Sequence, residues 1–201
     1  MNTVQVNKVG EYIASVCSRE VDFVGCIMVD KCDDVIPSDD SRGRLTFAVV
    51  NILPSTTRRG MGHYILLGYK GRDVYYFDSY GVPLHLYSSH LAKYKRDVEG
   101  RGCRIITLGK RLQSDSSLVC GLYTLWCAYT LVRRGVRGLR DTITKVFTRD
   151  YIRNDRKIVS LAYTAFGSHL PSCARTFCER KYMNKSSYTR CISYICRGRY
   201  N

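Results

Sequence analysis

Residues 64–81 read YILLGYKGRDVYYFDSYG, and this stretch decides how the middle of the chain folds. Two short runs rich in aromatic and β-branched residues, Tyr64–Tyr69 and Asp73–Asp78, are separated by Lys70–Arg72. Gly71 in that turn adopts the left-handed backbone angles of a tight hairpin without a steric penalty. The stretch therefore predicts two antiparallel neighbouring strands, the second ending at Ser79–Pro83.

The sequence on either side adds further strands and a set of helices. Leu45–Leu53 is a nearly continuous apolar run, typical of a buried strand, and Cys103–Leu108 predicts a fourth strand. From Cys120 the apolar residues follow one helix face, and Gly135 marks a helix end. The remaining predicted elements are a helix at Val4–Cys17 followed by an acidic loop up to residue 40 with a turn at Asp33–Asp40, a helix at His85–Tyr94, a basic helical region after Gly135 to about Asp150, and a last helix capped by Asn154 or Asp155 and ended by Gly167. This is an α+β fold with a small central mixed or antiparallel sheet flanked by helices.

The length and the charge point to one domain that attracts polyanions. The 201 residues suit a single domain, expected over residues 1–170, with a basic, cysteine-bearing tail at 171–201. The acidic segment 1–40 has 3 basic and 8 acidic residues, so 29 basic and 9 acidic residues remain in 41–201, a net charge of +20. We expect DNA as a partner through non-specific phosphate contacts, although such a charge can also serve solubility alone.

The composition excludes two other classes of protein. A hydrophobic content of 45% is too high for a mostly disordered chain. The longest apolar-rich stretch, Cys120–Val132, is shorter than the roughly 20 residues of a membrane helix, so no membrane association is expected. The N-terminal residues do not resemble a secretory signal, so the ten cysteines indicate a reducing, intracellular setting in which thiols are buried core, metal ligands or reactive groups. The protein is expected to be a monomer.

Three reactive side chains stand at the ends of predicted elements: His63 before one strand, Asp78 after the next, and Cys120 at the start of a helix. A helix N-terminus lowers the pKa of a thiol from its free value of about 8.5, which favours the nucleophilic thiolate. A histidine beside it transfers the proton, and a carboxylate orients the histidine. Gln113 and the backbone N–H of Cys120 suit an oxyanion hole. Taken singly, these residues are typical of core, surface and turn positions; their joint order carries the hypothesis.

The motifs GHY at 62–64, YYFDSYG at 75–81 and Q-x6-CG at 113–121 resemble the adenovirus protease (adenain) family of cysteine proteases, especially the enzymes of invertebrate viruses and virus-like transposons. The resemblance covers about Leu45–Arg134, the expected catalytic core (45–134), and implies a papain-like packing of the cysteine helix against the sheet. It implies a general base and acid, an orienting carboxylate, a nucleophile and an oxyanion-hole donor: His63, Asp78, Cys120 and Gln113. Tyr64 stands where the family often has Trp, so an aromatic face beside the imidazole would lack the indole.

The resemblance also implies regulation. Adenovirus proteases are activated by DNA and by a short viral peptide, which joins a cysteine on the strand before the oxyanion-hole glutamine. Cys103 has the corresponding place in this sequence, although it also reads as an ordinary strand residue. The chemistry itself requires no cofactor.

The tail has a cysteine pattern of its own. Cys173-x4-Cys178 and Cys191-x4-Cys196 are separated by 12 residues, and four thiolates in paired spacing can close a tetrahedral zinc site. Two disulfides, or four unrelated cysteines, fit the same spacing. Seven basic residues interleaved with tyrosines make the tail a second candidate for contact with nucleic acid.

The resemblance implies a viral maturation endopeptidase that cleaves virion precursor proteins, in the virion and the host cell nucleus. One alternative is an isopeptidase that removes a ubiquitin-like modifier, as deSUMOylases and deubiquitinases do, with the same catalytic residues. The other is an inactive protease fold that serves as a DNA-binding structural protein of the virion.

Overall fold

A mixed five-stranded sheet forms the centre of the protein, which we describe from a computed structural model over residues 1–16, 20–37, 43–57 and 62–170. The strands are β1 (Val21–Met28), β2 (Leu45–Asn51), β3 (Tyr64–Lys70), β4 (Asp73–Phe77) and β5 (Arg104–Thr107), in spatial order β1-β2-β3-β4-β5. The outer pairs, β1–β2 and β4–β5, are parallel, and the inner pairs are antiparallel. The predicted α+β class with a small mixed sheet is confirmed.

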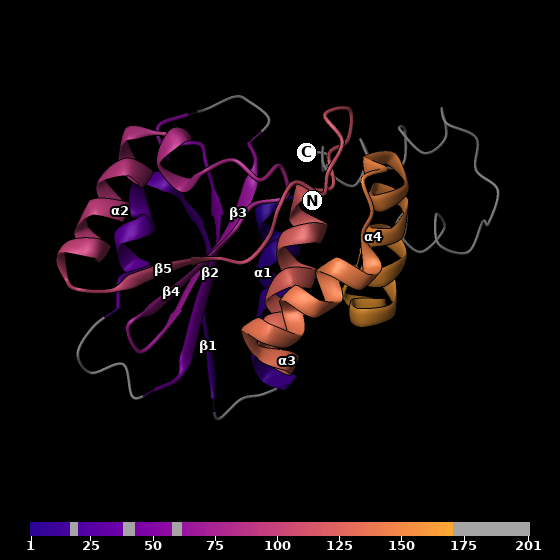
Figure 1. The fold of residues 1–201 in the computed structure, drawn as a ribbon, viewed down its shortest axis with the longest axis horizontal. Helices are drawn as coiled ribbons and strands as arrows, with labels where there is room; N and C mark the ends of the chain where they lie inside the picture. The colour runs from indigo at the N-terminus through magenta and orange to yellow at the C-terminus, as the bar shows by residue number, and fades with distance from the viewer. Residues whose placement is uncertain (17–19, 38–42, 58–61, 171–201) are drawn as a thin grey trace.

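Helices cover both faces of the sheet, because residues along the inner strands alternate between two apolar cores (Figure 1). On one face Leu66 and Phe77 pack with α1 (Thr3–Val16), α3 (Cys120–Val146) and α4 (Tyr151–Phe166). On the other face Ile65 and Leu67 pack with α2 (Ser89–Gly100) and the 3-10 helix η1 (Val29–Val35). The site described below lies between the first of these layers and the sheet, at the start of β3 and the end of β4.

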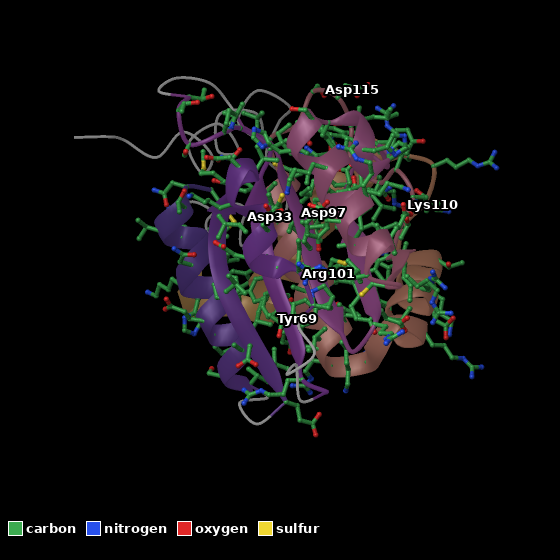
Figure 2. All side chains as sticks on the ribbon, turned by 90° about the vertical axis from the view of Figure 1, so that its left-hand side faces the viewer. Asp33, Tyr69, Asp97, Arg101, Lys110 and Asp115 are labelled. Carbon is green, nitrogen blue, oxygen red and sulfur yellow. The ribbon has the colours of Figure 1, made fainter. Side chains whose placement is uncertain are left out.

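Ion pairs on the α2 side join segments that are distant in the sequence. The Lys93 ammonium lies 3.1 Å from an Asp33 carboxylate oxygen of η1 and 2.7 Å from Asp97 of its own helix. Figure 2 shows Asp33 and Asp97 facing each other across this surface. All three side chains are well exposed, so solvent screens both pairs and each adds little to the stability of the fold.

The sequence analysis missed one strand. Residues after the first helix were expected to form an acidic loop, but Val21–Met28 forms β1, parallel to β2. This strand is at the sheet edge and only Val21 in it is buried, so its sequence lacks the apolar run that marks a central strand. It packs against α1 at Gly10, where an added Cβ would overlap the Phe23 ring.

Two helix boundaries also differ from the prediction. The segment His85–Tyr94 divides into a short 3-10 helix η2 (Leu84–Leu86) and α2, which starts after Ser88 because that side chain caps it by accepting from Leu91 N–H. Gly135 breaks the helix as expected, with φ of 65°, and the helical region predicted after it follows at once, so α3 is kinked. Asp150, not Asn154 or Asp155, caps α4.

Gly68 in β3 offers a test of the sheet packing, because an added Cβ there would lie 2.8 Å from the Thr46 carbonyl oxygen. That neighbour is backbone and cannot swing away. We expect Gly68→Ala to lower the free energy of unfolding in urea by about 1–3 kcal/mol. The control is Gly100→Ala, whose added Cβ meets nothing within 4 Å. Equal stability of the two variants would contradict the packing described here.

Within the part of the chain that the structure describes, no helix is both long and apolar enough to cross a membrane. The tail at 171–201 lies outside the described residues, so the expected boundary at residue 170 stays a prediction.

Candidate active site

The β3–β4 hairpin and the start of α3 bring His63, Asp78 and Cys120 together. His63 immediately precedes β3 and Asp78 immediately follows β4, so the antiparallel register places both at the same end of these two inner strands. Cys120 is the first residue of α3, which packs on β3. His63 Nε2 lies 2.5 Å from Asp78 Oδ1, and the Cys120 side chain hydrogen-bonds the same imidazole. Because Nε2 faces Asp78, Nδ1 is the nitrogen available to the sulfur.

The electrostatics of the cluster favour a thiolate–imidazolium pair. Burial alone would lower the pKa of His63, but the hydrogen bonds to Asp78 and Cys120 outweigh burial and raise that pKa to about 9. Burial alone would raise the pKa of Cys120, but His63 and the backbone N–H of Tyr64 hold it below the ordinary thiol value. The charged form of each partner therefore stabilises the other.

Asp78 is fixed on three sides. One carboxylate oxygen accepts from His63 and from the Tyr80 N–H at 3.2 Å, and the other accepts from the Val82 N–H at 2.7 Å. Its side chain is fully buried. Burial would raise the pKa of Asp78, but the His63 hydrogen bond and these N–H donors lower it below the ordinary range. The carboxylate stays ionised and holds one orientation of the imidazole.

Two tyrosine rings pack against the imidazole, and the sequence analysis assigned a role to neither. The Tyr80 ring centroid lies 4.7 Å and the Tyr87 ring centroid 5.7 Å from that of His63. Tyr64, the expected aromatic neighbour, contributes its backbone to the site: its N–H contacts Cys120, and its carbonyl accepts from Thr124 at 2.9 Å. The position of Tyr80 in the FDSYG block was the signal that could have identified it.

Gln113 is completely buried in the loop that leads to Cys120, and its amide is fully used within the protein. Its Nε2 donates to the Ser117 carbonyl at 2.8 Å and to the Tyr80 hydroxyl at 3.2 Å, and its Oε1 accepts from Ser79 at 2.6 Å. For Gln113 to donate to an oxyanion, one N–H has to leave its acceptor, and the longer bond to Tyr80 is the weaker one. The backbone N–H of Cys120 opens α3 and has no acceptor within the helix.

The other predicted cysteine sites lie elsewhere. Cys103 precedes β5 and packs at the margin of the α2-side core, so its role as the thiol for an activating peptide stays a prediction. The four tail cysteines, Cys173, Cys178, Cys191 and Cys196, lie outside the described residues. Among the residues that are described, no group of three or more His, Cys, Asp or Glu side chains is arranged to hold a metal ion.

Comparisons with known proteins add little to this geometry. No protein family and no curated protein matches the sequence. Among solved structures, an AvrA deletion variant with IP6 and CoA is similar to this chain, with a TM-score of 0.44, 12% sequence identity, and coverage of 93% of this chain and 67% of that chain. A likeness of this degree carries no conclusion about activity, so the argument for function rests on the site itself.

Proposed function

We propose that this protein is a cysteine endopeptidase of the adenain type that cleaves virion precursor proteins during maturation. The observation that supports the proposal is the buried relay of Cys120, His63 and Asp78, in which the pKa of the thiol is lowered and that of the imidazole is raised. A cysteine that serves only as core has the opposite shift, as Cys127 in the same helix shows: burial raises its pKa well above the ordinary value.

The reaction follows from the positions of these groups. The Cys120 sulfur attacks the scissile carbonyl carbon, and the N–H of Cys120 at the start of α3 stabilises the developing oxyanion. His63 donates its proton to the leaving amine as the C–N bond breaks, which leaves an acyl thioester on Cys120. Water then attacks the thioester while His63 accepts its proton; the C–S bond breaks, the acid is released, and the thiolate of Cys120 and the imidazolium of His63 are restored. Asp78 orients His63 throughout.

An isopeptidase acting on ubiquitin-like modifiers would use the same relay, and it differs in the substrate alone. The test is a pair of electrophilic peptide probes: one with a Gly-rich recognition sequence of the endopeptidase kind, the other a ubiquitin-like protein with an electrophile at its C-terminal Gly-Gly. Mapping of the modified cysteine is the readout. Selective labelling of Cys120 by the short peptide supports the proposal, and labelling by the modifier alone supports the isopeptidase.

A second property, DNA binding, is favoured by a basic surface on the α3–α4 layer. Nine basic side chains between residues 133 and 157 are exposed: Arg133, Arg134, Arg137, Arg140, Lys145, Arg149, Arg153, Arg156 and Lys157. The same segment has two exposed acidic residues, Asp141 and Asp150. We propose that this surface binds DNA phosphates without sequence preference and keeps the protease on the DNA of a packed virion. Uniform, unselective labelling in the probe experiment, with DNA binding intact, would favour the structural-protein alternative.

The test of the DNA proposal is charge reversal on two faces. Replacing Arg149, Arg153 and Arg156 with Glu changes the charge by six units on the α4 face, and replacing Arg72, Arg96 and Arg101 makes the same change on the α2 face. We expect the first variant to lose affinity for duplex DNA and to reduce the slope of log Kd against log salt by up to about 0.9 per lost phosphate contact. The second variant should bind more nearly like the native protein. Equal losses would show that only the total charge matters.

A further inference from the structure

We infer that Asp155 of α4, together with its neighbour Asn154, positions the loop Leu112–Val119 that carries Gln113 and leads into Cys120. The inference rests on the proposed function and extends it, because it makes a helix outside the expected catalytic core (45–134) necessary for the reaction. Asp155 does not touch the reacting atoms, so it is a positioning residue.

Asp155 is a buried carboxylate, 1% exposed, that points into the loop. Its Oδ2 accepts from both the hydroxyl of Ser114, at 2.5 Å, and the backbone N–H of Ser114, at 3.3 Å. Its Oδ1 accepts from the Tyr123 hydroxyl at 3.1 Å. One carboxylate thus joins α4, the loop before the nucleophile and the first turn of α3.

Asn154 completes the attachment. Its Nδ2 donates to the carbonyl of Leu112, at 3.1 Å, and to that of Thr148, at 2.9 Å. The Leu112 carbonyl also accepts from the Tyr123 hydroxyl at 3.2 Å. The Leu112 carbonyl precedes Gln113 and the Ser114 N–H follows it, so the peptide groups on both sides of Gln113 are held from the α4 side.

The β4 side holds the same residues from the opposite direction. The Ser79 carbonyl accepts from the N–H groups of Leu112 and Gln113, at 2.8 and 3.0 Å, and Ser79 lies next to Asp78. The loop is therefore hydrogen-bonded on one side to Ser79, which follows Asp78, and on the other side to Asn154 and Asp155. Figure 2 shows Asp115 at the rim of the molecule, where its side chain is 84% exposed and pairs with Arg111 at 2.7 Å.

Folding alone does not account for a carboxylate at this place. All hydrogen-bond partners of Asp155 described above are neutral hydroxyl and N–H groups, and no cation pairs with it among the described residues. A buried, unpaired carboxylate costs stability that an apolar side chain would not cost. The helix cap is already supplied by Asp150, which accepts from Arg153 N–H at 2.9 Å. What Asp155 adds is a fixed position for Ser114 and hence for the loop.

The experiment compares Asp155→Ala with Asp155→Asn in the full chain. The alanine variant removes every bond to Ser114. The asparagine variant keeps an oxygen for Ser114 and presents an N–H₂ to the Tyr123 hydroxyl, which can accept it and still donate to Leu112. Two rates are measured for each: peptide hydrolysis, which needs the oxyanion hole, and alkylation of Cys120 by iodoacetamide, which needs the thiolate alone.

We expect Asp155→Ala to lower kcat about 10²-fold while KM changes little, since a misplaced donor affects the transition state and not the bound substrate. Alkylation of Cys120 should stay within about twofold of the native rate, because the thiolate depends on His63. Asp155→Asn should restore most of kcat. The control Asp150→Ala removes the N-terminal cap of the same helix and should leave kcat unchanged. Retained kcat in Asp155→Ala, or parallel loss of hydrolysis and alkylation, would overturn the inference.

A second readout keeps this inference separate from the proposed function. If the native protein cleaves no peptide, the endopeptidase proposal fails, but hydrogen exchange of the amides at 113–119 still tests the attachment. Faster exchange there in Asp155→Ala, by about tenfold or more, with unchanged exchange in the sheet, supports the positioning role. Unchanged exchange in the loop rejects it.

Discussion

Replacing Cys120 with alanine is expected to abolish peptide hydrolysis, with kcat at least about 10³-fold below the native value. The sulfur is the atom that forms the thioester, and neither His63 nor Asp78 can replace it as a nucleophile in this geometry. The side chain is small and 9% exposed at the start of α3, so its loss leaves a minor cavity. The folded state should persist, as circular dichroism and the urea midpoint would show.

The matched control is Cys127→Ala. Cys127 is buried in the same helix, two turns further along, but burial raises the pKa of its thiol and it takes no part in the relay. This variant should hydrolyse peptides at close to the native rate and lose some stability. Full activity in Cys120→Ala, or equal loss in both variants, would refute the assignment of the nucleophile.

Replacing His63 with alanine is expected to cause the second-largest loss of peptide hydrolysis. It should also shift the pH profile for alkylation of Cys120. In the native protein the pKa of Cys120 is lowered by His63, so alkylation should begin at a lower pH than for a free thiol. Without the imidazole, burial acts unopposed and raises the pKa of Cys120. The alkylation profile should therefore shift to higher pH, and hydrolysis at neutral pH should fall at least about 10²-fold.

The peptidase activity proposed for the native protein should also be lost at alkaline pH. The pKa of His63 is raised to about 9, so its imidazolium persists below that pH and is lost as the pH rises through it. Its interaction with Asp78 and Cys120 contributes stability that is complete below the ordinary imidazole pKa of about 6.5 and disappears above about 9. Hydrolysis should follow a bell-shaped profile with its alkaline limb near that value.

His90→Ala is the control for this profile, because His90 is exposed in α2 on the other face of the sheet. Its removal should change neither the alkylation profile nor the alkaline limb. A native profile in His63→Ala would mean that another group activates Cys120.

The local sequence was sufficient to predict the hairpin and the residues at which its strands begin and end. Gly71 and the alternating aromatic and apolar residues specify β3 and β4, and the predicted ends differ from the observed ones by one residue. The register of an antiparallel pair then brings the residue before β3 and the residue after β4 to the same end of the two strands. For this reason His63 and Asp78 could be paired from the sequence before any distance was known.

Tertiary structure decided the surroundings of these residues. An edge strand such as β1 has no apolar run to mark it, since one of its sides is left to solvent. Tyr87 reaches the imidazole from beyond Pro83, and Asp155 reaches Ser114 across 41 positions of the chain. No local pattern encodes contacts between segments so far apart.

The reactive groups, their order, and the elements that end at them can be read from the chain alone, because hairpins and amphipathic helices are set by residues close to one another. The occupied amide of Gln113 and the hydrogen bonds from α4 to the loop before Cys120 emerge only in the folded protein. Those features depend on the packing of whole helices against the sheet, in which a buried polar group has to find its partners wherever the fold places them.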